Sequence, residues 1–382
     1  MSFAFSLDRG VREWSGISLN TVFGQRRNAA SPRFLWMLRE ILRFNKLAVL
    51  DRASGMLAGL SLEAYLAKRR FSKSFTGDYL LPMGAAIWST PPADMLAFPA
   101  ENFIAFFENH RLVSQDRPIW RTVSGGGLAT WSGWSRRFAT GSGSQPGRRV
   151  TRRAGKVHVR DVHGHEDVFD RVVMAAHTDQ TLAMLGDATP EERNILGAIR
   201  YRPNAVYLHR DRALMPRRRR VWASWNYLAS SDSDAPFRDA SVTYWMNRLQ
   251  NLPEDKPVFV SLNPVEPPHP DLTFATFEYD HPQFDGAAIS AQNALGQIQG
   301  SGNTWYCGAW CGYRFHEDGL KGRAGGGAGD RRGDPWRTST PKAPPGRQRQ
   351  QVTMRRGDDL AGERPPPPEA AALYPARSCM PG

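Results

Sequence analysis

The sequence predicts an α/β protein, and four segments carry that prediction. Residues 167–176 read as a strand with a continuous apolar end that leads directly into a helix, as in a strand buried on both faces. Residues 204–262 hold several strand-like runs, and residues 32–110 hold apolar side chains at helical spacing. Residues 305–321 read as a short strand, a glycine turn and the start of an acidic helix.

The first third of the chain is expected to be mostly helical after two short strands. Pro32 opens a helical pattern, and Ser61 is placed to cap a second helix. A proline pair at 91–92 separates the two helical stretches that follow. The expected elements are strands at 3–7 and 13–19 and helices from 32, from 61, over 78–87 and over 92–110.

The region after residue 155 is expected to alternate strands with helices. Residues 280–285 (DHPQFD) are expected to form a turn stabilised by Asp side chains, and substrate contact by Asp280, His281 and Asp285 is the alternative. The expected elements are strands at 156–161, 167–176, 204–209, 221–227, 241–246, 257–262 and 305–307, with helices over 180–185 and 286–298.

Segment 305–321 (WYCGAWCGYRFHEDGLK) carries the clearest functional signal. A strand that runs into a helix N-terminus presents unpaired N–H groups and the positive end of the helix dipole. That arrangement suits a phosphate or an electron-rich ring edge, and glycines let the backbone approach the ligand closely. The segment therefore predicts a cofactor contact.

The same segment resembles the C-terminal flavin-contacting motif of the flavin-containing amine oxidase-like proteins, in their bacterial branch of predicted NAD/FAD-binding oxidoreductases. Residues 44–48 (FNKLA), 80–88 (LLPMGAAIW), 120–126 (WRTVSGG) and 277–285 (FEYDHPQFD) are similar to the same branch. The resemblance covers most of residues 1–125 and 155–321. It implies hydride transfer from a C–N or C–C bond to FAD, chemistry that the cofactor itself supplies, and it marks no catalytic side chain.

The resemblance also implies which residues contact FAD. They fall on the 305–321 motif, on the tip of the strand that ends near residue 176, and on a glycine pair. They are Gly308, Ala309, Trp310, Gly312, His316, Glu317, Asp318, Gly319, Leu320, Ala175, Ala176, His177, Gly125 and Gly126.

One part of the family pattern is not found. Such flavoproteins carry a strand, a G-x-G-x-x-G turn and a helix near their start, and nothing near Met1 fits. The chain is therefore expected to be an N-terminally truncated member with an incomplete FAD/NAD(P)-binding Rossmann-like domain, interleaved with a substrate domain of mixed sheet and helices. Impaired FAD binding follows, and a non-catalytic fragment or binding module is the alternative.

Two segments lose the periodic pattern. Residues 125–154 are expected to be an irregular linker or frame-damaged sequence, and residues 322–382 a disordered basic tail rich in Pro and Gly, or a second frameshift. The predicted blocks are 1–124 (substrate side), 125–154, 155–200 (partial cofactor domain), 201–300 (substrate-domain sheet), 301–321 (FAD-contact motif) and 322–382.

The net charge of +13 suggests a polyanion-binding protein when taken alone. Its distribution argues against that, because residues 321–382 contribute twelve Lys/Arg and six Asp/Glu, and residues 136–153 hold six Arg. The remainder is close to neutral, so no specific nucleic-acid partner is expected. Polyanion binding stays as a less favoured alternative.

The remaining predictions concern metals, membranes and substrate. Three Cys are too few for a disulfide framework, and no metal site is expected because Cys307 and Cys311 lack a second ligand pair. No secretory signal and no membrane span are found, so a cytoplasmic protein is expected. Helix 34–44 is amphipathic; it is interpreted as core-facing, with peripheral membrane contact left open. Aromatic residues at 222, 225, 227, 244 and 245 are interpreted as core, or as the lining of a cavity for a small apolar substrate.

Overall fold

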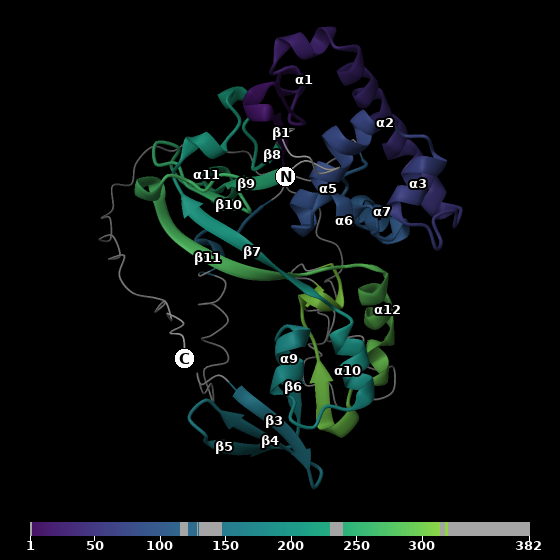
Figure 1. Cartoon of the computed structure of the whole chain (residues 1–382), viewed down its shortest axis with the longest axis vertical. Coiled ribbons are helices and arrows are strands. Elements are labelled where there is room, and N and C mark those ends of the chain that lie inside the picture. Colours follow the sequence, from purple (N-terminus) through teal and green to yellow (C-terminus); the bar gives the residue numbers. More distant parts are fainter. Residues whose placement is uncertain are drawn as a thin grey trace, which may run out of the picture. The chain divides into compact units, whose positions relative to one another are not determined.

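The protein is described here from a computed structural model that covers residues 2–114, 121–127, 129, 147–229, 240–313 and 318–319. The chain divides into a unit of Met1–Asp330 and a unit of Arg331–Gly382, and all described residues belong to the first. That unit is a mixed α/β fold with sheets of seven, three and two strands (Figure 1). The α/β class predicted from the sequence is confirmed.

The largest sheet has the strand order β11-β7-β10-β9-β8-β1-β2. Its pairs are antiparallel except for β1 and β8, which run parallel although they are more than 200 residues apart in the sequence. Four consecutive residues of β1, from Ala4 to Leu7, are buried, so this strand is covered on both faces of the sheet. The strands are β1 (Phe3–Leu7), β2 (Arg12–Ser15), β7 (Tyr201–His209), β8 (Trp225–Ala229), β9 (Ala240–Trp245), β10 (Phe259–Leu262) and β11 (Thr273–Pro282).

Helices from the first third of the chain pack beside this sheet. The Ser31 hydroxyl accepts from Phe34 N at 3.4 Å with Pro32 in the first turn, and the Ser61 hydroxyl accepts from Ala64 N at 3.1 Å. Each such cap is worth about 1 kcal/mol, and both helix starts were predicted. The helices are α1 (Leu19–Val22), α2 (Pro32–Ala53), α3 (Leu62–Lys68), α4 (Lys73–Phe75), α5 (Leu81–Trp88), α6 (Pro92–Met95) and α7 (Ala100–Asn109).

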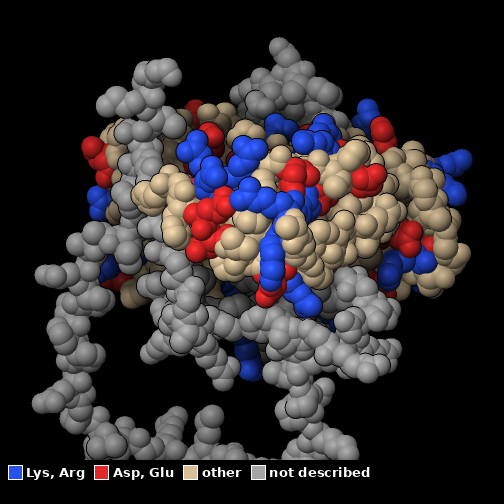
Figure 2. Space-filling model, turned by 90° about the horizontal axis from the view of Figure 1, so that it is seen from below, with Lys and Arg blue, Asp and Glu red and all other residues tan. Residues whose placement is uncertain are grey.

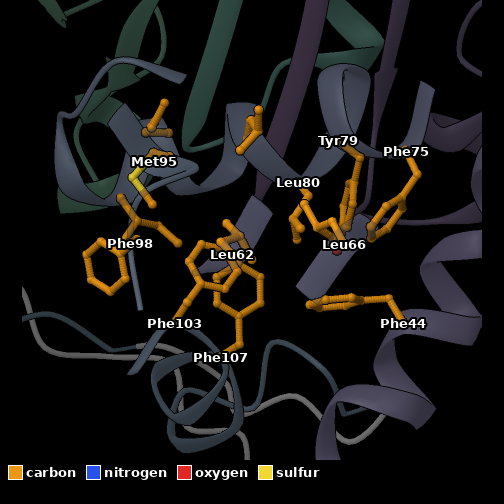
Figure 3. Packing of buried hydrophobic residues seen from close by; sticks show 14 of the residues in the cluster. Phe44, Leu62, Leu66, Phe75, Tyr79, Leu80, Met95, Phe98, Phe103 and Phe107 are labelled. Carbon is orange, nitrogen blue, oxygen red and sulfur yellow. The ribbon is translucent and has the colours of Figure 1, made fainter. Parts of the chain in front are cut away.

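Aromatic rings fill the core between these helices (Figure 3). Phe103 stacks on Phe107 with ring centroids 4.4 Å apart, and both are packed against Trp88. Phe44 of α2 meets Phe75 at 5.4 Å on the other side of the same cluster. We call this cluster the first core.

A second core lies around a two-stranded parallel sheet. β6 (Val172–Met174) pairs with β12 (Thr304–Tyr306). Three helices and a three-stranded antiparallel sheet pack around this pair. The other elements of this region are β3 (Gly147–Arg153), β4 (Lys156–Asp161), β5 (Glu166–Phe169), α9 (Thr178–Met184), α10 (Pro190–Gly197) and α12 (Gly286–Ala294); α11 (Met246–Gln250) follows β9 in the large sheet.

The prediction that residues 125–154 are irregular is wrong for their last part. Residues 147–153 form β3, which pairs with β4 from Gly147 to Arg153. The segment shows no apolar alternation, but Val150 is 3% exposed and anchors the strand in the second core. Ion pairs hold the rest of the strand in place of apolar contacts, since Arg152 binds Glu192 and Arg153 binds Glu166.

Further boundaries differ from the prediction. The strand expected over 167–176 is divided into β5 and β6, and the helix expected over 92–110 is divided into α6 and α7. β2 ends at Ser15 instead of continuing to residue 19, because the Ser18 hydroxyl caps α1. β8 begins at Trp225, later than predicted. Residues 280–282 continue β11 where a turn was predicted, and Asp285 instead caps α12 by accepting from Ala288 N at 2.9 Å.

The charged residues of the three-stranded sheet are largely neutralised. Lys and Arg side chains alternate with Asp and Glu on the face shown in Figure 2. Arg153 and Arg160 both bind Glu166, at 2.7 and 3.1 Å, and Arg152 binds two carboxylates. An Arg-rich stretch whose cations already have carboxylate partners is a poor polyanion site, so these ion pairs argue against polyanion binding by the three-stranded sheet.

Candidate cofactor site

Two chain segments predicted to contact a cofactor lie side by side. The parallel register pairs Tyr306 with Met174, and Cys307 N continues it by donating to Met174 O at 3.0 Å. Because parallel strands end at the same edge of a sheet, the residues that follow β6 and β12 meet there. We call residues 175–177 and 308–312 the paired tips. Ala175 is exposed and Ala176 is half-buried, so backbone is accessible at this edge.

Gly308 sets the course of the chain after β12. Its φ of 156° and ψ of 168° belong to a region that is essentially restricted to glycine. A Cβ at this position would lie 2.5 Å from the indole nitrogen of Trp310. That indole is almost fully buried and donates to Ala176 O at 3.2 Å, which ties one tip to the other. A side chain at Gly308 would therefore displace the contact that joins the tips.

The turn after Gly308 is held from α12. The Gln292 amide donates to Trp310 O and to Gly312 O, at 2.8 Å each. Sequence reasoning missed Gln292, since a single amide on a helix has no distinctive pattern. The two hydrogen bonds fix the orientation of both carbonyls, so the backbone of residues 308–312 is preorganised.

Asp318, from the segment predicted to be an acidic helix start, reaches the same place. The Asp318 carboxylate accepts from Tyr313 N at 3.0 Å, and a Cβ on Gly312 would lie 2.6 Å from that carboxyl group. A Cβ on Gly319 would lie 3.7 Å from Ala309 N. Gly308, Ala309, Trp310, Gly312, Asp318 and Gly319 are thus gathered with Ala175, Ala176 and His177. His316, Glu317 and Leu320 lie outside the described residues.

His177 offers polar atoms at the N-terminus of α9. Its ring stacks on Tyr201 with centroids 4.4 Å apart, and the Tyr201 hydroxyl accepts from Thr178 N at 2.9 Å. Burial raises the pKa of Tyr201, so this hydroxyl stays protonated at neutral pH. His177 Nδ1 and Thr181 Oγ1 are buried and have no hydrogen-bond partner in the described part of the chain. Small residues, accessible backbone and an unpartnered imidazole nitrogen fit a dinucleotide cofactor at this edge.

The glycine pair does not join this site in the described contacts. Gly125 and Gly126 have φ of +84° and +65°, so both adopt conformations that favour glycine. A Cβ on Gly126 would lie 3.2 Å from the side-chain amide of Gln250 at the end of α11. The structure therefore places this pair against α11, and their predicted cofactor contact stays a prediction.

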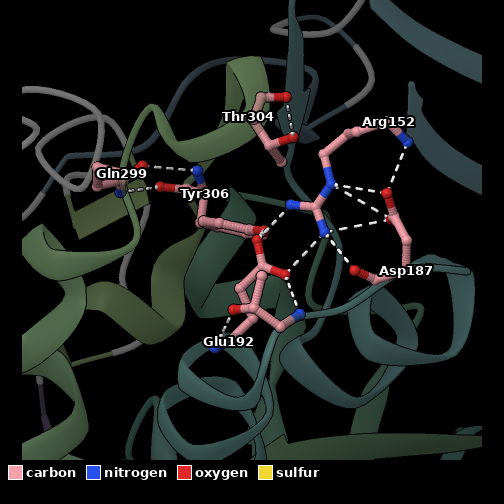
Figure 4. Close-up of polar contacts among 8 residues, drawn as sticks. Arg152, Asp187, Glu192, Gln299, Thr304 and Tyr306 are labelled. Atoms are coloured by element: carbon pink, nitrogen blue, oxygen red, sulfur yellow. Dashed lines mark hydrogen bonds and ion pairs between the residues drawn. The ribbon is translucent and has the colours of Figure 1, made fainter. Parts of the chain in front are cut away.

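A buried network of ion pairs and hydrogen bonds joins β12 to β3 and α10 (Figure 4). Glu192 of α10 is fully buried and accepts from Arg152 Nη2 at 2.9 Å and from the Tyr306 hydroxyl at 2.5 Å. Burial raises the pKa of Glu192, but hydrogen bonds from Arg152 and Tyr306 outweigh it and hold that pKa below its ordinary value. Arg152 also binds Asp187. β3, α10 and β12 are joined through these charges.

Cys311 at the end of the turn should be chemically inert. Burial, with the nearby Cys307 second, raises the pKa of the Cys311 thiol to about 12. Only the thiolate reacts with alkylating reagents, so iodoacetamide at about pH 8 should leave Cys311 unmodified in the native chain. Peptide mass spectrometry should find it modified once urea unfolds the protein. Equal modification in both states would contradict the buried position.

In the described part of the chain, no group of three or more His, Cys, Asp or Glu could hold a metal ion.

An apolar cavity of about 210 Å³ lies between the large sheet and helices α2 and α5. Trp225 of β8 lines it, and the indole N–H of Trp14, another lining residue, is buried with no hydrogen-bond acceptor in the part of the chain described here. Of the five aromatic residues proposed from the sequence, Trp225 alone is among the lining residues. Trp222 and Trp245 pack with Phe259 in a separate cluster, Tyr227 lies in the first core and Tyr244 packs against its rim.

Comparison with known proteins identifies the fold. No protein-family model and no curated protein matches the chain. A CLA-producing fatty acid isomerase from P. acnes superposes with a TM-score of 0.54 and 13% identity, over 85% of this chain and 78% of that chain. A putrescine oxidase variant with redesigned cofactor binding has a TM-score of 0.51 and 12% identity, over 85% and 80%. The chain has the fold that these proteins share, and the amine oxidase-like fold implied by the sequence motifs is confirmed.

Proposed function

We propose that this chain is an FAD-dependent oxidoreductase of the amine oxidase type. The observation that carries the proposal is the meeting of the paired tips, where the ends of two parallel strands lie together and Asp318 is held beside them by the amide of Tyr313. FAD, when bound, would accept a hydride from a C–H group of the substrate, and loss of a proton from the neighbouring atom would convert a C–N or C–C single bond into a double bond. The protein's part is to bind and orient the cofactor and to exclude water.

Each group at the paired tips has a role in that proposal. Gly308 has no side chain and Ala309 has only a methyl group, so the backbone here can approach the ribityl and phosphate part of the cofactor. The unpartnered His177 Nδ1 supplies a polar contact.

The apolar cavity is the place we propose for the substrate. Its walls are mostly aliphatic and aromatic side chains from β1, α2, α5 and β8. A dry cavity of roughly 150 Å³ accepts benzene in another protein, so a volume of about 210 Å³ suits a single ring or a short alkyl chain. A neutral acceptor atom on the ligand would satisfy the Trp14 indole N–H.

The affinity for FAD should be weak, since the sequence contains no G-x-G-x-x-G turn to hold the pyrophosphate. The visible absorbance spectrum of the purified full chain tests this, as isolated and after FAD is added and excess is removed. We expect a colourless protein that binds added FAD with a dissociation constant on the order of ten micromolar and loses part of it on desalting.

Two results would change the account in different ways. A stoichiometric yellow protein as isolated would contradict the weak binding but keep the function, and bleaching by amines without oxygen would then identify substrates. No binding of FAD at any concentration would overturn the function and leave a non-catalytic binding module.

A further inference from the structure

The outer face of α2 is unusual for a helix that packs on a protein core. Its inner face holds Phe34, Met37, Phe44 and Ala48, all nearly inaccessible. Phe34 packs on Trp14 of β2, and Phe44 packs on Phe75 of α4 and Phe107 of α7. This confirms that the helix is core-facing, as the sequence predicted. A second apolar set points the other way: Leu35, Trp36, Leu42 and Leu50 are 45%, 52%, 64% and 55% exposed.

These exposed residues share one side of the helix. At 100° per residue, positions 35, 36, 39, 42, 43, 46 and 50 fall within about 120° of each other. The three that are not apolar are all cations, Arg39, Arg43 and Lys46, and all are exposed. We call the seven residues the α2 outer face; the helix that carries them is about 33 Å long.

Acidic side chains are excluded from this face. The two acids of α2, Glu40 and Asp51, are 2% and 4% exposed and bind inward, to Ser72 and to Tyr65 and Arg69. The guanidinium of Arg39 lies 5.4 Å from the Trp36 ring centre, and that of Arg43 lies 4.7 Å from the Phe71 ring centre. The cations thus stand among apolar groups without neutralising partners on the same face of the helix.

We propose that the α2 outer face binds the surface of an anionic lipid bilayer. Leu and Trp side chains interleaved with Arg and Lys suit the boundary between headgroups and acyl chains, where apolar groups enter and cations meet phosphate and carboxylate. Long cationic side chains can lie along the apolar region and keep their charge at the headgroups. Binding is peripheral, and no helix in the described ranges is long and apolar enough to cross a bilayer.

Co-sedimentation of the full chain with vesicles tests the proposal. We expect binding to vesicles with about 30% phosphatidylserine to exceed binding to pure phosphatidylcholine vesicles on the order of tenfold or more. Raising salt from about 0.1 M to about 0.5 M should weaken it, because the Debye length shortens. Both Arg39→Gln with Lys46→Gln and Trp36→Gln with Leu42→Gln should lose most of the binding.

Matched variants elsewhere provide the controls. Arg193→Gln with Arg248→Gln removes two exposed cations from other helices, and Val265→Gln with Phe274→Gln removes two apolar residues that are 59% and 57% exposed. Both should bind vesicles like the parent, and circular dichroism should find all four variants folded. Equal binding to the two lipid mixtures, or full binding by the α2 variants, would overturn the proposal. So would a parent dimer in light scattering that Trp36→Gln with Leu42→Gln makes monomeric, because the face would then join two copies.

Discussion

Replacing Arg152 by methionine is expected to lower the free energy of unfolding by about 3–5 kcal/mol. The guanidinium binds Glu192 through both terminal nitrogens and also reaches Asp187 (Figure 4). Glu192 is fully buried, so methionine leaves a carboxylate in the second core without its cationic partner. Urea denaturation at neutral pH measures the loss. Arg202→Met is the control, because Arg202 and Asp94 are 3.2 Å apart but about half exposed, and it should cost below about 1 kcal/mol.

The effect of Arg152→Met should also depend on pH. In the parent the folded pKa of Glu192 is lowered, so its contribution to stability is present above the unfolded pKa and is lost as the pH falls through the folded pKa. Without Arg152, burial dominates and raises the pKa of Glu192, so acid protonates the group and removes the unpaired charge. The difference between parent and variant should shrink from neutral pH toward about pH 4. A difference that stays constant would show that Glu192 is not the group left unpaired.

Replacing Phe103 by alanine should destabilise the first core by about 3–5 kcal/mol. The ring is fully buried and packs on Phe107, with ring centroids 4.4 Å apart (Figure 3). Its centroid lies 5.4 Å from that of Trp88. Alanine leaves a cavity that stacked aromatic neighbours fill only in part. Phe274→Ala removes the same ring from a position that is 57% exposed, and it should change stability by no more than about 0.5 kcal/mol. Equal losses in the two variants would contradict the packing described for the first core.

Local rules account for much of what the sequence predicted correctly. The caps at Ser31 and Ser61 depend only on residues within one helical turn, and the structure has both. The apolar run before Ala175 and the strand before Gly308 were each recognised separately. Their meeting follows from the geometry of parallel strands, which places both carboxyl ends at one edge.

Long-range polar partners could not be predicted. Arg152 and Glu192 are 40 residues apart, and each looks in sequence like an ordinary surface charge. The same limitation led to the wrong interpretation of β3, whose arginines are ordered by carboxylates from β5 and α10 rather than by an apolar stripe. Gln292 holds the turn only because the fold places the carbonyls of Trp310 and Gly312 within hydrogen-bond distance of α12. Such roles depend on the finished fold.

The proposal that the paired tips contact FAD is tested most directly by calorimetric titration of FAD into three proteins. Gly308→Ala places a Cβ against the Trp310 indole and breaks the link between the tips, while Gly296→Ala adds the same group where no atom lies within 4 Å. We expect the parent and Gly296→Ala to bind with one dissociation constant and Gly308→Ala to bind at least roughly tenfold more weakly, with all three equally folded by circular dichroism. Equal affinity in all three, or no binding by the parent, would contradict the account.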